Sequence, residues 1–117
     1  MATKSESYVP DAGDIIWLEF DPTRANEQSG RRPALVFSAR PLAVLTQLSL
    51  VAPITSTVRG WPTQVELPTG MPISGAVMVE QCRAVNFVER HAQLVCRAPA
   101  AVLERAREIL AAIAGIK

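Results

Sequence analysis

The chain has 117 residues and a mass of 12.7 kDa; 49% of its residues are hydrophobic, 20% are charged, and its formal net charge is +1. These values predict one globular domain over residues 1–117 and exclude disordered and fibrous proteins. They also exclude the strongly basic surface that some nucleic-acid-binding domains carry, so any site for an anion must be local.

The first predicted elements are an N-terminal arm and two strands that enclose a polar loop. Residues 1–12 are expected to be a flexible arm; they hold no apolar core, so no export or membrane signal is expected. Strand-forming residues predict a strand from residue 14 to residue 20, which the following DP pair ends because proline donates no ladder hydrogen bond. A polar loop runs to Arg32, and ALVFS, residues 34–38, predicts the second strand.

Short strands separated by turns are expected through the middle of the chain. Residues 39–47 predict an irregular connection that can include a short helical turn, and residues 48–54 predict a buried strand that a proline ends or places at an edge. A fourth strand is expected at residues 63–67, and the last ones within residues 76–81 and 88–95. This spacing predicts a small barrel or a rolled sheet.

The C-terminal residues predict an amphipathic helix that begins at Pro99. Proline suits the first turn of a helix, and the residues after it place apolar side chains at helical spacing with charged side chains opposite. We expect the apolar stripe to cover the sheet, and binding to a partner protein is the alternative. The stripe consists of Val102, Leu103, Ala106, Ile109, Leu110 and Ile113.

The two cysteines, Cys82 and Cys96, do not predict a zinc site. They lack CxxC spacing and a matching pair of histidines, since His91 is the only histidine of the chain. Reduced structural thiols in a reducing cytosol are the simpler interpretation. We therefore expect no metal, no cofactor and a cytoplasmic location.

The polar loop between the first two strands holds candidates for phosphate chemistry. It sets carboxylates and guanidiniums, among them Glu27, Arg31 and Arg32, between two rigid strands. Because Pro33 biases Arg32 toward an extended backbone, the guanidinium can be held at the rim of the sheet, where its shape suits a phosphate. An exposed ion pair of Arg32 with Glu27 or Glu19 is the alternative.

Two later strand ends carry further candidates. Thr55 and Ser56 follow a predicted strand, where their hydroxyl groups can donate to a phosphate oxygen or can cap a turn. Glu80 ends the predicted strand AVMVEQ, where its carboxylate can act as a base, orient an arginine, or simply be exposed.

The tryptophans are expected to play different roles. Trp61 lies between a glycine and a proline in a turn-rich loop, where an exposed ring can stack on an unpaired base. Trp17 is expected in the core or in a dimer contact. His91 has no partner in the sequence, and a surface or packing role is expected for it.

Four blocks of the sequence, in the same order, resemble the MazF/PemK toxins, the ribonuclease half of bacterial toxin-antitoxin pairs. The opening YVPDAGDIIWLEFDPT is similar to the opening of that family, and EQSGRRPALVFS is similar to its EQxGxRPxLVxS segment. VAPITSTVRGWP and AVMVEQCRAV are similar to the VxPxTSxxxGxP and VxxDQxRxx segments. The resemblance covers nearly the whole chain, and it implies an SH3-like small barrel with flanking helices.

The resemblance also implies a function. It predicts a metal-independent, sequence-specific endoribonuclease that cleaves single-stranded RNA, including mRNA, to a 2′,3′-cyclic phosphate and a 5′-hydroxyl. It further predicts a homodimer that a cognate antitoxin neutralises, with no membrane association. The alternative is a non-catalytic gyrase poison on the same fold, like CcdB.

The resemblance assigns roles to particular residues. The arginine of GxRP is Arg32, an acid or a transition-state clamp, and the TS pair is Thr55 and Ser56, which bind the scissile phosphate. Either Glu27, the glutamate of EQ, or Glu80, at the place of the family's aspartate, is the base or the residue that orients Arg32. The remaining candidates for binding RNA are Arg31, Arg59, Trp61 and Gln81.

Overall fold

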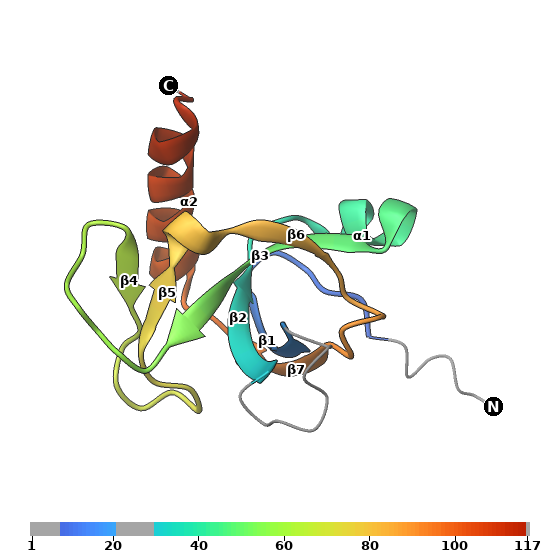
Figure 1. Ribbon diagram of the computed structural model, residues 1–117, viewed down its shortest axis with the longest axis horizontal. Coiled ribbons are helices and arrows are strands. Elements are labelled where there is room, and N and C mark those ends of the chain that lie inside the picture. Colours follow the sequence, from blue (N-terminus) through green and yellow to red (C-terminus); the bar gives the residue numbers. More distant parts are fainter. Residues whose placement is uncertain (1–7, 21–29, 117) are drawn as a thin grey trace.

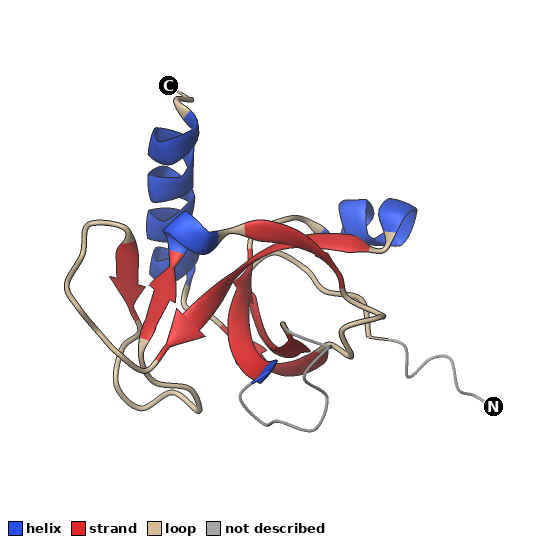
Figure 2. Ribbon diagram, viewed as in Figure 1, coloured by secondary structure: helices blue, strands red, loops and turns tan. Residues whose placement is uncertain are grey.

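The computed structural model describes residues 8–20 and 30–116, which contain seven strands, two α-helices and a short 3₁₀ helix (Figures 1 and 2). The two α-helices lie at opposite ends of the sheet (Figure 2). In chain order the elements are β1 (Asp14–Glu19), β2 (Arg31–Val36), α1 (Arg40–Thr46), β3 (Leu48–Thr55), β4 (Gln64–Glu66), β5 (Ala76–Met78), η4 (Val79–Gln81), β6 (Arg83–Asn86), β7 (Gln93–Arg97) and α2 (Ala100–Ala114).

The strands form one antiparallel sheet. Its order is β4-β5-β3-β2-β1-β7, and β6 pairs with β3. The sheet curls into an open, barrel-like form around the central strands, and α2 stands beside β4 and β5 (Figure 1). The predicted mainly-β architecture with a C-terminal helix is therefore confirmed.

Alternation along the central strands builds an apolar core on each face of the sheet. Ile15 and Leu35 belong to the core beneath α2, whereas their neighbours Ile16 and Ala34 belong to the core on the other face. The predicted amphipathic helix is confirmed, and each large apolar side chain that α2 buries contributes about 1.5–3 kcal/mol. The buried residues of α2 are Val102, Ala106 and Ile109.

On the side of β3 that faces away from β2, the strands β5 and β6 pair with β3, and η4 interrupts this pairing. Ile54 of β3 pairs with Val77, whereas Val51 pairs with Arg83. Between these pairs β3 has two residues and the chain from β5 to β6 has five, so three residues leave the ladder as η4. The strand predicted over residues 76–81 is therefore wrong in its second half, and β6 was not predicted.

Pro53 lies inside β3, so it does not end the strand as predicted, but among the described strands only β2 pairs with it, as at a local edge. The amide of Phe37 donates to the carbonyl of Leu50, so even-numbered residues of β3 direct their backbone groups toward β2. Pro53 therefore faces the opposite side, where η4 has left the ladder. Its missing N–H costs no hydrogen bond there.

The second strand begins earlier than predicted. Arg31 and Arg32 already pair with Glu19 and Leu18 of β1. The amide of Phe20 donates to the carbonyl of Gly30, so even-numbered residues of β2 face β1 and the proline at position 33 does not interrupt this ladder. Both arginines therefore stand on a strand rather than in a loop.

Two other segments also differ from prediction. Residues 40–46 form the seven-residue helix α1, which is longer than the short helical turn that the sequence allowed, and Gln47 ends the helix with a φ of 62°. The strand expected over residues 88–95 lies at β7, after a turn in which His91 has a φ of 55°.

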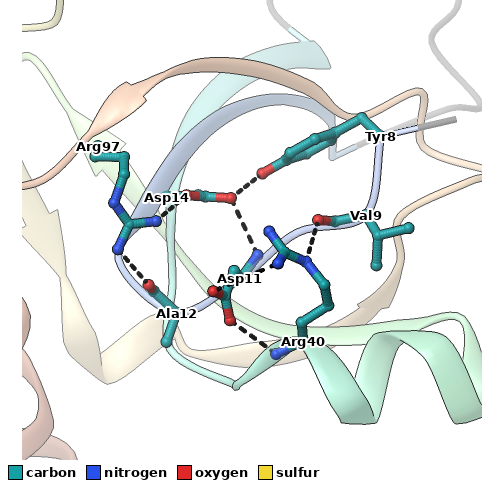
Figure 3. A network of polar contacts seen from close by, with 7 residues as sticks. All are labelled: Tyr8, Val9, Asp11, Ala12, Asp14, Arg40 and Arg97. Carbon is teal, nitrogen blue, oxygen red and sulfur yellow. Dashed lines mark hydrogen bonds and ion pairs between the residues drawn. The ribbon is translucent and has the colours of Figure 1, made fainter. Parts of the chain in front are cut away.

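A polar network fixes the start of β1 against α1 and β7 (Figure 3). The Asp14 carboxylate, 4% exposed, accepts hydrogen bonds from Arg97 at 2.6 Å, from the Tyr8 hydroxyl and from the Asp11 amide. Asp11 accepts from the Arg40 amide at 2.9 Å, and this bond lowers the pKa of the Asp11 carboxyl. Burial and the bond to Asp14 raise the pKa of Tyr8. From Tyr8 onward the predicted flexible arm is therefore anchored, and residues 1–7 lie outside the described residues.

Both cysteines are free and partly buried against the core beneath α2. Burial raises the pKa of Cys82 to about 11 and also raises the pKa of Cys96. Both thiols are therefore protonated at neutral pH, as suits a structural role.

Replacing Arg97 should destabilise the fold more than replacing an equally exposed arginine on α2. The side chains of Arg97 and Arg105 are both 61% exposed, but the carboxylate of Asp14 is 4% exposed and that of Glu108 is 68% exposed. Arg97→Ala leaves a buried carboxylate with fewer donors, so we expect a loss of roughly 1–2 kcal/mol after solvent screening.

Urea unfolding of the two variants measures this difference. The control Arg105→Ala should change the free energy of unfolding by less than about 0.5 kcal/mol. Equal losses in both variants would show that the buried end of the Asp14 network contributes nothing to stability.

Candidate active site

A groove of about 540 Å³ lies where β2 begins and β3 ends. Its charged lining, among the residues that the structure describes, consists of Arg31 and Arg32. One wall comes from the loop that precedes β5. The lining residues are Trp17, Arg31, Arg32, Pro33, Ile54, Thr55, Ser56, Pro72, Ile73 and Ser74.

The pairing of β2 with β3 brings the predicted phosphate-binding residues together. Ala34 is paired with Pro53. Arg32 lies two residues before this last pair on β2, and Thr55 lies two residues after it on β3, so both stand just beyond the paired ends of the two strands. Arg32, Thr55 and Ser56 therefore line one groove, although sequence placed them only at separate strand ends.

The hydroxyl group of Thr55 both caps a turn and keeps a donor. Its oxygen accepts a hydrogen bond from the amide of Thr57 at 3.0 Å, which is the turn-capping role considered from sequence. A hydroxyl that accepts still has its own proton to donate. The two roles weighed for Thr55 are therefore compatible.

Gly75 allows the wall of the groove to approach β3. Its φ is +125°, and a Cβ atom built there would lie 2.1 Å from the carbonyl oxygen of Thr55. Its own carbonyl accepts from the amide of Leu67 at 2.8 Å, so the backbone cannot easily move away. Glycine at this position holds the loop of residues 72–74 against the end of β3.

Arg31 is held by two neighbours. Its Cζ atom lies 5.5 Å from the centroid of the Trp17 ring, and its Nη2 donates to Oε1 of Gln93 on β7. Trp17 is partly buried and lines the groove, so the expectation of a core position needs correction, whereas a dimer contact stays a prediction. Neither Trp17 nor Gln93 was predicted as a site residue, because their approach to Arg31 depends on the register of three strands.

Two predicted residues of the AVMVEQ block lie away from the groove. Glu80 and Gln81 are exposed on η4, which contacts β3, β4 and α2. Ala76, at the start of β5, is paired with Thr55, and the chain then runs back along β3 toward η4. The structure therefore does not bring Glu80 to Arg32 within one chain.

The other predicted residues are also outside the groove or outside the described chain. Arg59 and Trp61 lie in the loop between β3 and β4, where the Arg59 Cζ is 5.4 Å from the centroid of the Trp61 ring. Trp61 is 50% exposed, as expected for a ring available for stacking. Glu27 lies outside the described residues.

A second hollow, of about 580 Å³, separates α1 from the turn between β6 and β7. His91 lines it, and its Nδ1 lies 3.1 Å from Oε1 of Glu19. The remaining lining is mostly apolar, with Val44, Phe87 and Val88 among its residues. It offers no guanidinium from the described residues, so the groove at Arg32 is the better candidate for an anion.

Residues 8–20 and 30–116 contain no group of three His, Cys, Asp or Glu side chains placed to hold a metal ion. In the same residues, no helix is long and apolar enough to cross a membrane.

The groove can bind and stabilise a phosphate group. Arg32 offers N–H donors that match a pair of phosphate oxygens, and the hydroxyl groups of Thr55 and Ser56 offer two more. Fixed donors of this kind are most effective where negative charge develops during a reaction. These donors would stabilise a pentacovalent phosphorane more than the uncleaved phosphodiester, because more negative charge develops on its oxygens.

Comparison with known proteins points in the same direction. Residues 11–114 match a family model described as "PemK-like, MazF-like toxin of type II toxin-antitoxin system". The endoribonuclease toxin MazF of Escherichia coli K12 is 39% identical over 85 residues, which cover 73% of this chain and 76% of that protein. The endoribonuclease toxin ChpB of the same strain is 35% identical over 112 residues, which cover 91% and 92%.

Solved structures are similar over almost the whole chain. A crystal structure of MazF from Deinococcus radiodurans has a TM-score of 0.86 and 41% identity, covering 94% of this chain and all of that one. A MazE-MazF crystal structure from the same organism has a TM-score of 0.85 and 38% identity, covering 95% of this chain and all of that one.

Gly75→Ala should damage the groove, whereas Gly70→Ala should not. Both glycines have positive φ, but a Cβ atom at Gly70 meets nothing within 4 Å. Gly70→Ala therefore measures the backbone cost alone, roughly 1 kcal/mol, and Gly75→Ala adds the collision with Thr55.

Unfolding in urea and backbone amide NMR shifts of Arg32 and Thr55 test this difference. We expect the larger loss of stability, and shifts at both residues, in Gly75→Ala only. Matching results for the two variants would mean that the close approach at Thr55 does not shape the groove.

Proposed function

The chain belongs to the PemK-like, MazF-like toxin family of type II toxin-antitoxin systems, and we propose that it is a sequence-specific endoribonuclease that cleaves single-stranded RNA, including mRNA, without a metal ion. The observation that carries this proposal is the convergence of Arg31, Arg32, Thr55 and Ser56 in one groove. The relatives MazF and ChpB, which are named endoribonuclease toxins, support it. A CcdB-like gyrase poison would not require this set of donors.

In the proposed reaction, the 2′-hydroxyl of one nucleotide attacks the adjacent phosphorus. A base removes the proton of the hydroxyl, the bond from phosphorus to the 5′-oxygen breaks, and that oxygen gains a proton. The products are a 2′,3′-cyclic phosphate and a 5′-hydroxyl. The hydroxyl protons of Thr55 and Ser56 and the guanidinium of Arg32 bind the non-bridging oxygens as charge develops on them.

The candidates for the acid and the base differ in their pKa and in their position relative to the groove. A free arginine has a pKa above about 12, so Arg32 is better suited to stabilising charge than to exchanging a proton. We nevertheless assign it as the acid that gives a proton to the leaving 5′-oxygen, and it regains that proton from water. Glu80 lies on η4, away from the groove, so we assign the base to Glu27. Glu80, Gln81, Arg59 and Trp61 are then left for nucleotides farther from the cut.

The proposed biological setting follows from the family. MazF is found with MazE in the Deinococcus radiodurans complexes, so we infer that a cognate antitoxin binds and neutralises this chain. We also propose a homodimer that acts in the cytoplasm, where mRNA is available.

Arg32→Ala should remove RNA cleavage and leave the fold intact. Losing a donor aimed at the developing charge typically costs about 10²–10³-fold in rate, and here the donor is charged. Rates on a long single-stranded RNA should fall at least that far, whereas Arg32→Lys, which keeps a point charge but not the bidentate fork, should retain part of the activity.

Circular dichroism checks that these variants are folded, and Arg105→Ala is the matched surface control. The control should cleave at the wild-type rate. An Arg32→Ala variant that is equally fast would remove Arg32 from the mechanism.

Cleavage should continue in excess EDTA and leave defined ends. Because the nucleophile is the substrate's own 2′-hydroxyl, the downstream fragment should carry a 5′-hydroxyl that polynucleotide kinase can phosphorylate directly. The upstream fragment should carry a cyclic phosphate, which mass spectrometry identifies by the absence of one water. Loss of cleavage in EDTA, or 5′-phosphate ends, would contradict the proposed chemistry.

A further inference from the structure

The two adjacent arginines of the groove stand on opposite faces of β2. Arg31 is paired with Glu19 and Arg32 with Leu18, and consecutive residues of a strand direct their side chains to opposite faces. Trp17 is paired with Pro33 on one side and with Gln93 on the other. Arg31, Trp17 and Gln93 therefore lie on one face, on three neighbouring strands.

The contacts on that face hold the Arg31 guanidinium before any ligand binds. The group lies over the indole of Trp17, 5.5 Å from the centroid, and reaches across β1 to donate to Gln93. Arg31 is nevertheless exposed as a residue, and it lines the groove. A guanidinium fixed in this way has already lost much of its conformational freedom, which lowers the cost of binding.

A phosphate does not require such an arrangement, but a nucleobase benefits from it. Phosphate binding uses N–H donors at the edge of a guanidinium, and at Arg31 one of these already serves Gln93. Unpaired bases stack on aromatic rings and on the planes of arginine guanidinium groups. The apolar residues Pro72 and Ile73 in the wall of the groove suit the ring of a base.

We propose that Arg31 stacks on one nucleobase of the bound strand, next to the phosphate bound by Arg32 and Thr55. Trp17 and Gln93 are positioning residues that back and orient the guanidinium. The inference rests on the proposed function for its ligand, a single-stranded nucleic acid. It divides the tasks of the groove, with Arg32 binding the phosphate backbone and Arg31 binding a base.

Binding of oligonucleotides with and without bases tests this division. The probes are fluorescein-labelled deoxy decamers of A, C, G and T and an abasic decamer; all lack the attacking 2′-hydroxyl, so none is cleaved. Fluorescence anisotropy gives the ratio of the Kd for the abasic decamer to the Kd for the best-bound homopolymer. For the wild-type chain we expect a ratio of roughly 10 or more, as base stacking typically provides.

Arg31→Lys should lower the ratio to about 3 or less by weakening the base-bearing decamer alone, because lysine keeps the charge but has no plane to stack. The Kd for the abasic decamer and its salt dependence should stay within about twofold of wild type. A ratio that is unchanged in Arg31→Lys, or a wild-type chain without preference for bases, overturns the proposal.

Two substitutions at Gln93 separate positioning from mere packing. Gln93→Leu removes the hydrogen-bond acceptor of Arg31 and should lower the ratio. Gln93→Glu keeps an acceptor and should leave the ratio at the wild-type value. Arg105→Lys, on the exposed side of α2, should leave the ratio at the wild-type value. Equal ratios in Gln93→Leu and Gln93→Glu would remove Gln93 from the proposal.

The outcome is independent of RNA cleavage. If RNA is not cut but Arg31→Lys abolishes the preference for bases, the proposed enzyme activity fails and the base-stacking site stands. If RNA is cut and the ratio does not respond to Arg31→Lys, the stacking role fails and the proposed enzyme activity stands.

Discussion

The antiparallel pairing of β2 with β3 is the constraint on which the candidate site depends. Its last pair, Ala34 with Pro53, leaves Arg32 and Thr55 just beyond the paired strand ends, where both line one groove although they come from distant parts of the chain. The ladder tolerates Pro53 because its missing N–H faces the point where η4 leaves the sheet. Gly75 then brings a loop against the end of β3, at a distance that no other residue permits. The backbone geometry of these strands and of this loop thus determines where the side chains of the site lie.

A near-neutral chain can present an anion site because its positive charge is local. Arg31 and Arg32 lie side by side in sequence, but strand alternation gives them different surroundings. Arg32 stands with hydroxyl groups, whereas Arg31 is placed between an indole and an amide. At the other end of β1, the buried carboxylate of Asp14 anchors the strand through Tyr8 and Arg97, so both ends of this strand are fixed by polar contacts.

Sequence patterns could predict those parts of the fold and site that are local. The helix α2 was predictable because its 3.6-residue periodicity begins after a proline and ends before a glycine. Arg32 and Thr55 were predictable candidates because polar residues at strand ends lie at the rim of a sheet. The position of Glu80 was not predictable, because a three-residue interruption of a ladder leaves no periodic signal. The contact of Trp17 with Arg31 was not predictable for a related reason, because strand alternation shows which face Trp17 is on, but only the register of the strands shows that it meets Arg31.

The location of the scissile phosphate tests the central claim most directly. A crystal structure of the chain with its RNA substrate, in which the attacking 2′-hydroxyl is replaced by hydrogen, would show that location. The account predicts the phosphate within hydrogen-bond distance of Arg32 and Thr55. A phosphate bound instead at η4, beside Glu80 and Gln81, or in the hollow at His91, would contradict it.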